Sequence, residues 1–230
     1  MITVHHLNNS RSQRILWLLE ELGTPYEVKR YERDLETMRG PATLKAVHPL
    51  AKSPVITDTG AEGEITVAES GAIIDYLVRR YGKETLTPAE DTTAYRDYIY
   101  WLHFAEGSLM PPLLMRLVFE KVKTSPMPFF IKPVAKMIAN KVMSDFVSPE
   151  IKHTMDFIEG YLADHEWFAG ESLSGADIQM SFPLEASVAR GAIGEQYPQI
   201  HAYVKRFQAR TAYLRALEKG GDYDYGPSRS

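Results

Sequence analysis

The pattern of apolar residues changes once along this chain, near residue 83, and that change limits the fold more than any other feature. Up to residue 82, short alternating runs typical of strands are interleaved with stretches of helical spacing. Beyond residue 90, apolar residues recur almost only at helical spacing. Residues 83–90 are polar, contain Pro88 and lack periodicity, which is typical of a linker. The sequence therefore predicts two domains, 1–82 and 91–230, joined by the linker 83–90.

The first domain is predicted to have the element order β-α-β-α-β-β-α. Residues 2–7 and 26–31 are typical of strands, and a helix between them places Glu20 and Glu21 on its polar side. A β-α-β unit of this kind is expected to be a right-handed parallel crossover. Gly60 and Gly63 between two short apolar runs indicate an antiparallel hairpin, followed by a helix up to residue 82. Four strands with helices on both faces would make a small α/β domain.

The second domain is predicted to be all helical. One long helix is expected over 95–117, bent at Pro111–Pro112, with further helices over 134–146, 150–165, 176–190 and 198–209. The proline-rich segment 125–133 interrupts this run, and its Phe129–Phe130–Ile131 is a packed loop, a lid or a patch that touches a membrane. The tail 220–230 is expected to be loose.

Composition excludes several classes of protein. The net charge of −4 does not suit a nucleic-acid binder, and the absence of cysteine excludes disulfides, thiolate zinc sites and cysteine nucleophiles. The seven histidines are not grouped at metal-ligand spacing, so we expect no metal. No run reaches the roughly 18–20 apolar residues that span a bilayer. We therefore expect a cytoplasmic protein without stable membrane insertion.

The loop before the first helix carries a candidate site. Residues 8–14 read Asn-Asn-Ser-Arg-Ser-Gln-Arg and place hydroxyls and backbone N–H groups at a helix start. A helix start carries partial positive charge and unpaired donors, so it stabilises an anion. Ser10 is the first candidate for the functional hydroxyl, with Asn9 and Ser12 as alternatives and Arg11 as added positive charge. A purely structural role is open, because Ser10 and Gln13 have the spacing of a capping box.

Five segments, taken in this order, resemble the cytosolic glutathione transferases of the serine-type bacterial and fungal kind. These are residues 10–22, 48–55, 69–70, 101–110 and 174–177. The resemblance covers nearly the whole chain. It implies a thioredoxin-like α/β domain followed by an all-α domain.

The resemblance also implies a glutathione site. Ser10, or else Asn9 or Ser12, would donate to the glutathione thiolate. Pro54 would be cis, after Ser53 in place of the usual apolar residue, and the backbone of Val55 would pair with the cysteinyl unit. An ordinary trans proline is the alternative. The remaining expected contacts are Lys52 to the glycine carboxylate (with Arg39, Lys45 and His48 as weaker candidates) and Glu69 and Ser70 to the γ-glutamyl end.

Each of these contacts has a plainer interpretation. Lys52 would otherwise be a solvated loop lysine, and Ser70 would only cap the helix that follows. Four residues of the long helix are expected to line the pocket for a second substrate, unless they only pack between domains or subunits: Tyr98, Trp101, His103 and Phe104. Ser174 and Asp177 form a capping box that we interpret as structural.

The function that the resemblance implies is conjugation of glutathione to apolar electrophiles, with glutathione-dependent reduction of peroxides also open. The family resemblance implies a homodimer. Thiol transfer through a protein cysteine is excluded, because the chain has none. The alternatives are a non-catalytic scaffold with this fold and a carrier of apolar ligands.

Overall fold

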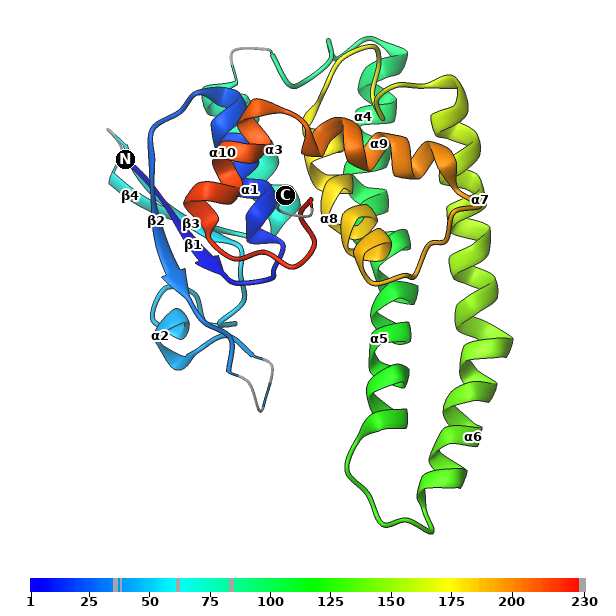
Figure 1. Ribbon diagram of the computed structural model, residues 1–230. Coiled ribbons are helices and arrows are strands. Elements are labelled where there is room, and N and C mark those ends of the chain that lie inside the picture. The colour runs from blue at the N-terminus through cyan, green and yellow to red at the C-terminus, as the bar shows by residue number, and fades with distance from the viewer. Residues whose placement is uncertain (35–36, 38, 61–62, 83–84, 228–230) are drawn as a thin grey trace.

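The computed structural model describes residues 1–34, 37, 39–60, 63–82 and 85–227 (Figure 1). Residues 83 and 84 of the predicted linker therefore lie outside the described residues. The elements of the first half are β1 (Ile2–Leu7), α1 (Ser12–Leu22), β2 (Tyr26–Tyr31), α2 (Ala42–Lys45), β3 (Val55–Gly60), β4 (Gly63–Ala68) and α3 (Ser70–Tyr81). Those of the second half are α4 (Thr93–Phe104), η1 (Ala105–Leu109), α5 (Met110–Thr124), α6 (Lys132–Val142), η2 (Met143–Val147), α7 (Ser148–Asp164), α8 (Gly175–Ala189), α9 (Pro198–Gln208) and α10 (Thr211–Gly220).

The sheet has the strand order β2-β1-β3-β4. β1 and β2 are parallel, with Val4 opposite Val28, whereas β1 with β3 and β3 with β4 are antiparallel. These pairings confirm the predicted crossover and hairpin. His6 contacts Ser12 of α1, so its neighbour Leu7 points to the other face, where it packs with Leu44 of α2. Helices therefore lie on both faces, as predicted.

Helix α1 is buried on all sides, which the sequence did not predict. Helix α10, also not predicted, packs along α1 and covers the side that carries Glu20 and Glu21 (Figure 1). Glu20 pairs with Arg215 at 2.7 Å and Glu21 with Arg210 at 2.6 Å. The predicted polar side of α1 is therefore covered, and its two carboxylates hold α10 and the residue before it to the first helix.

The long helices of the second half contain two π-helical turns, η1 and η2. Each turn is followed within two residues by proline, at Pro111–Pro112 and at Pro149. Proline cannot donate to the helical ladder, and the wider turn accommodates the carbonyls left without a donor. For this reason the helix does not stop at Pro149, and the segments predicted as 134–146 and 150–165 form one nearly continuous rod. The predicted break between α5 and α6 is confirmed.

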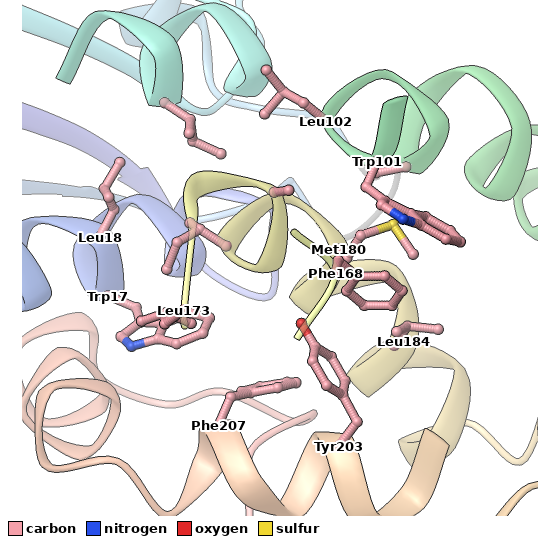
Figure 2. Packing of buried hydrophobic residues seen from close by; sticks show 14 of the residues in the cluster. Trp17, Leu18, Trp101, Leu102, Phe168, Leu173, Met180, Leu184, Tyr203 and Phe207 are labelled. Atoms are coloured by element: carbon pink, nitrogen blue, oxygen red, sulfur yellow. The ribbon is translucent and has the colours of Figure 1, made fainter. Parts of the chain in front are cut away.

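One hydrophobic core joins the two halves (Figure 2). Trp17 of α1 stacks on Phe207 of α9, with ring centroids 5.2 Å apart, and meets Tyr213 edge-on at 5.6 Å. Because the halves share this core, the domain boundaries at 82 and 91 stay a prediction. They are not visible as a gap in packing.

The segment after α10 is anchored by buried side chains. Tyr223 donates to Glu185 at 2.5 Å, and Tyr225 packs on Phe182. The expectation of a loose tail is therefore wrong for residues 221–227, while 228–230 lie outside the described residues. No helix in the described part of the chain is both long and apolar enough to cross a membrane.

Candidate active site

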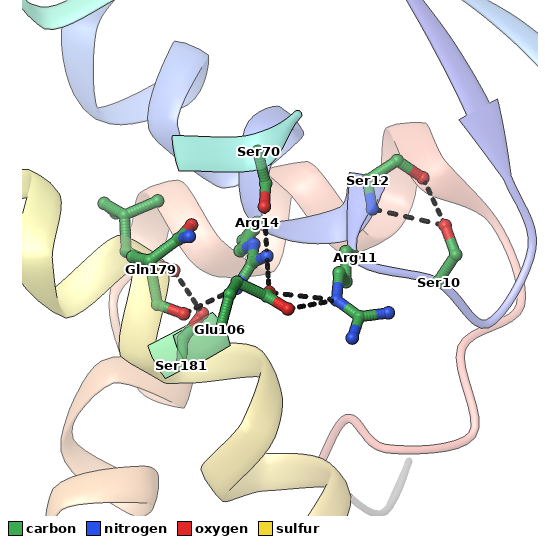
Figure 3. Close-up of polar contacts among 9 residues, drawn as sticks. Ser10, Arg11, Ser12, Arg14, Ser70, Glu106, Gln179 and Ser181 are labelled. Atoms are coloured by element: carbon green, nitrogen blue, oxygen red, sulfur yellow. Dashed lines mark hydrogen bonds and ion pairs between the residues drawn. The ribbon is translucent and has the colours of Figure 1, made fainter. Parts of the chain in front are cut away.

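Ser10 lies in the loop between β1 and α1 with only 6% of its surface exposed. Its hydroxyl oxygen accepts from the backbone N–H of Ser12 at 3.2 Å and lies 2.8 Å from the Ser12 hydroxyl (Figure 3). Helix α1 begins at Ser12, so the predicted capping box with Gln13 does not form. The Gln13 N–H bonds the Ser10 backbone carbonyl instead, at 3.2 Å. The Ser10 hydroxyl thus accepts from the first N–H of α1, although Ser10 is not the N-cap residue.

A chain of hydrogen bonds leads from Ser10 into the protein. The Ser12 hydroxyl donates to the Leu7 carbonyl at 3.2 Å and lies 2.8 Å from His6 Nδ1. We assign the proton of the neutral His6 ring to Nε2, so that Nδ1 also accepts from Ser12. Burial, followed by the charge of Arg30, lowers the pKa of His6 to about 4, which keeps the ring neutral near neutral pH. Ser12 therefore donates inward, and among the described residues the Ser12 oxygen is the acceptor for the Ser10 proton.

A group of charged residues lies beside this loop. Arg11 and Arg14 both donate to the carboxylate of Glu106 in η1, at 2.9 Å in the case of Arg11 Nε (Figure 3). Burial by itself raises the pKa of Glu106, but the two guanidinium charges outweigh it and hold this pKa below its ordinary value. Two cations and one anion leave a net charge of +1 next to the start of α1. This charge adds to the helix dipole in favouring an anion there.

The fully buried guanidinium of Arg14 also connects α1 to two further elements. It donates to the Ser70 hydroxyl at the start of α3 and to the Gln179 carbonyl of α8 at 2.6 Å. Ser70 is the first residue of α3 and does not cap it, which corrects the predicted capping role. Because the Ser70 oxygen accepts from Arg14, its own proton stays free to donate.

Three non-glycine residues in the described part of the chain have positive φ, and each stands immediately before a predicted site residue. They are Asn9 at 49°, Ala51 at 50° and Glu69 at 69°. Such backbone costs of order 1–3 kcal/mol per residue, and it gathers where function fixes a loop in one shape. The loops that carry Ser10, Lys52 and Ser70 are all of this kind.

The loop before β3 contains the predicted cis proline. The Ser53–Pro54 peptide is cis, and the Ser53 hydroxyl donates to the His5 carbonyl at 2.9 Å. Pro54 and Val55 are buried, whereas Lys52 is exposed. The weaker candidates Arg39 and Lys45 are exposed as well, and His48 is half-buried.

The predicted alternatives to Ser10 already have protein partners. Asn9 accepts from the Asp224 backbone and donates to the Asp224 carboxylate at 2.7 Å, which ties the loop to the tail. Ser12 is fully buried among β1 and α1. Arg11 is occupied by Glu106.

The expected second-substrate pocket is wrong for Tyr98 and Trp101. Each is 1% exposed, because α4 packs these two side chains into the shared core. Phe104 lies in an aromatic cluster with Trp101 at 4.9 Å and Phe157 at 5.9 Å, and His103 is exposed. Apolar residues of α8 and the tail lie beside the Ser10 loop. Phe182 lies 5.4 Å beneath the Arg11 guanidinium and packs with Ala186 and Tyr225.

Sequence reasoning did not identify Arg14, Glu106 or Gln179 as members of the site. Arg14 could have been found, because it stands four residues before Leu18 on a face that must be buried. Nothing in the sequence indicated that Glu106 reaches α1, since that contact depends on how the two halves pack. Among the described residues, no three histidine, aspartate or glutamate side chains could together hold a metal ion. A cavity of about 540 Å³ lies at the opposite ends of α1 and α3, near Leu22 and Tyr81, and is separate from this site.

Known proteins resemble both halves of the chain. The family model described as Glutathione S-transferase, N-terminal domain, matches residues 1–79, and the one described as Glutathione S-transferase, C-terminal domain, matches residues 123–211. Glutathione S-transferase 1 of Saccharomyces cerevisiae is 37% identical over 223 residues, which cover 95% of each chain. A crystal structure of a glutathione S-transferase from Actinobacillus pleuropneumoniae has a TM-score of 0.78 and 36% identity, covering 98% of this chain and 95% of that one. A family member from Pseudomonas fluorescens, solved with two glutathione bound, has a TM-score of 0.70 and 26% identity, covering 94% and 92%.

Proposed function

The chain belongs to the glutathione S-transferase family and is a glutathione transferase, and we propose that Ser10 is the residue that keeps the bound thiol ionised. The observation that carries this proposal is the position of its hydroxyl, at the start of α1 beside the charged group of Arg11, Arg14 and Glu106. Relatives over the whole chain bear the name of the enzyme, which argues against a non-catalytic scaffold.

The energy required is within reach of one hydrogen bond. A free cysteine thiol has a pKa near 8.5, so only a few per cent of it is ionised at neutral pH. Lowering that pKa by two units takes about 2.7 kcal/mol, and a hydrogen bond to a charged group contributes roughly 1.5–3 kcal/mol. The Ser10 proton would leave Ser12 for the sulfur, because a bond to an anion is about twice as strong as a neutral one.

The reaction then needs no further protein group to form a bond. The thiol proton goes to solvent, and the thiolate sulfur attacks an electrophilic carbon. A carbon–sulfur bond forms while the leaving group departs with its electron pair. In the peroxide alternative, two glutathione molecules would be oxidised to the disulfide while the peroxide is reduced to an alcohol and water. Assaying an activated aryl chloride beside an organic hydroperoxide tells the two activities apart.

The remaining glutathione contacts are proposed on the same loops. Ser70 has a proton free for the γ-glutamyl carboxylate, and exposed Glu69 would meet the amino group. Lys52 would pair with the glycine carboxylate, and the backbone of Val55 with the cysteinyl unit. We expect Ser70→Ala and Glu69→Ala to weaken glutathione binding by roughly 1–3 kcal/mol each, measured by calorimetry. An unchanged affinity in both variants would show that the γ-glutamyl end lies elsewhere.

An apolar electrophile would bind beside Arg11 and the Ser10 loop, on the side of the loop where Phe182 lies beneath Arg11. We also propose a homodimer. Its support is a groove of about 380 Å³ between α5 and η2, where Met115 and Phe146 are exposed, and an exposed Leu50 in the first half. Light scattering on wild type and Met115→Lys tests this, since a lysine in a dimer contact would shift the mass toward the monomer. The cytoplasmic location stays a prediction.

The decisive experiment compares Ser10→Thr with Ser10→Val. The two side chains have nearly the same shape, so their difference reports the hydroxyl alone. We expect the valine variant to bind glutathione within a few-fold of the threonine variant. Its bound thiol, followed by thiolate absorbance, should have a pKa at least about one unit higher, with lower turnover below neutral pH. Equal thiol pKa values in the two variants would exclude Ser10 and point to Asn9 or Ser12.

A further inference from the structure

The far end of the α5–α6 hairpin carries exposed apolar side chains that the transferase site does not use. In Figure 1 the two helices project beyond the rest of the molecule and are joined at their far end. We define the hairpin tip as residues 121–138. Phe129 is 87% exposed and Phe130 66%, and their rings meet edge-to-face at 5.6 Å. Further exposed apolar residues of the tip are Val122, Ile131, Val134, Met137 and Ile138.

The hairpin differs from the rest of the chain in charge. Between residues 113 and 142 there are six lysines and arginines but one acidic residue, while the whole chain has a net charge of −4. Lys123 is paired with that acid, Glu120, at 2.8 Å, and Lys141 with Asp145 just beyond this stretch at 2.5 Å. In the part of the chain that the structure describes, no ion pair joins Lys121, Lys132 or Lys136 to an acid. Positive charge that is free to act on a partner therefore surrounds the apolar tip.

We propose that the hairpin tip docks on an anionic lipid membrane, with Phe129 and Phe130 in the interface. A membrane surface accommodates both the exposed aromatic rings and the lysines of the tip. Aromatic rings enter the region between headgroups and acyl chains, while lysine heads stay hydrated beside lipid phosphates. A protein partner suits it less well, because lysine is depleted in the buried centres of protein interfaces. The tips of two copies carry the same charge and would repel each other.

The proposed contact is shallow. The longest exposed apolar run of the tip is Phe129–Phe130–Ile131, with prolines on either side of it at 126, 128 and 133. Prolines restrict the backbone, so less order is lost when the loop meets a surface. The tip lies far along the hairpin from η1, where Glu106 meets α1, so docking would leave the transferase site open. The proposal does not depend on the assignment of Ser10.

The test is cosedimentation of the full chain with phosphatidylcholine vesicles, with and without phosphatidylserine. We expect binding only to the phosphatidylserine vesicles, and weaker binding at high salt. Phe129→Ser/Phe130→Ser should lower the binding at least tenfold. Lys132→Gln/Lys136→Gln should lower it about fivefold per lysine. The matched controls are Leu214→Ser, an exposed apolar residue of α10, and Lys45→Gln/Lys205→Gln. Both should bind like wild type.

A second readout places the tip itself in the membrane. The three native tryptophans are buried, so a Phe130→Trp variant reports its own surroundings. Its fluorescence should shift to the blue with phosphatidylserine vesicles but not with phosphatidylcholine alone. The proposal is overturned if wild type does not bind at low salt, if the tip variants bind as well as the controls, or if Phe129→Ser/Phe130→Ser changes the molar mass in solution. The last result would make the tip a contact between copies.

Discussion

Glu106 keeps a third of its side chain exposed while Glu185 is fully buried, and their pKa values move in opposite directions. Glu106 receives hydrogen bonds from two arginines, whose charges more than offset the effect of burial on its pKa. Glu185 of α8 is fully buried and accepts from Tyr213 at 2.6 Å and from Tyr223. Burial raises the pKa of Glu185 to about 7, and these neutral donors offset it only in part. Two charged partners keep the pKa of Glu106 low, whereas at Glu185 neutral donors do not offset full burial.

The largest expected effect comes from removing the charge at Glu106. Glu106→Gln leaves the buried Arg14 without a counter-charge, so we expect a loss of roughly 3–5 kcal/mol in the free energy of unfolding. The matched variant Glu185→Gln replaces a carboxyl that holds its proton up to neutral pH, and should cost about 1 kcal/mol or less. Denaturant titration of both at neutral pH measures the difference. Equal losses would show that burial alone governs the two sites.

The pH dependence of stability sharpens the same comparison. The Glu185 carboxyl has a pKa of 4.5 when unperturbed and about 7 in the folded protein, so between these values the unfolded chain gives up this proton first. Stability should therefore fall as pH rises from about 4.5 to 7, by an amount on the order of 3 kcal/mol from this group. Asp177, whose pKa burial raises to about 6, contributes in the same direction. Glu106 contributes oppositely, because its stabilisation is lost as pH falls.

Unfolding at pH 5 and at pH 7.5 tests this expectation. Glu185→Gln should remove the part of the pH dependence of stability that comes from Glu185 and leave the part that comes from Asp177. If the free energy of unfolding of Glu185→Gln varies with pH as that of wild type does, Glu185 is ionised in the folded protein.

A smaller effect is expected from removing the tyrosine hydroxyls that donate to Glu185. Tyr223→Phe removes one donor and should cost about 1–2 kcal/mol. Because that hydrogen bond favours the ionised form of Glu185, its loss should also raise the pKa of Glu185. The pH range over which stability falls should therefore extend to higher pH. Tyr213→Phe makes the same change from α10, so the two variants should behave alike. If only the overall stability drops and the pH range stays in place, the tyrosines pack against the carboxyl without affecting its ionisation.

The smallest effect is expected at Asn9, where the contacts are exposed. Asn9→Ala removes both bonds to Asp224 and should cost under about 1 kcal/mol. Hydrogen exchange should show the tail 221–227 opening more often. Faster exchange around Ser10 as well would mean that the tail also holds the active-site loop in place.

The sequence predicted what depends on neighbours along the chain. The element order of the first half, the break at 125–133 and the cis peptide before Pro54 are confirmed, since turn residues and periodicity are local signals. What failed depends on distant contacts. The sequence around Tyr98 and Trp101 is compatible with a place in a pocket and with a place in the core. Only the packing of α4 on α8 decides between the two. The sequence placed the acids of α1 on its polar side but did not predict α10, which covers that side.

Some parts of the site were predicted from the sequence and others were not. The loops of Ser10, Lys52 and Ser70 came from short motifs, and all three follow a residue of positive φ. Arg14 and Glu106 come from opposite halves of the chain and were missed. Their contact spans 92 positions. No periodicity within either segment encodes it.

The packing of α10 on α1 has a consequence for how the chain is made. Arg215 and Glu20 are 195 positions apart, and Trp17 needs Tyr213 to complete its surroundings. At about 5–20 residues per second, a ribosome takes roughly 10–40 s to cover that interval. During synthesis α1 therefore waits, with its tryptophan uncovered, for a segment 195 positions later to emerge. Nascent chains released before α10 should be the ones that chaperones retain.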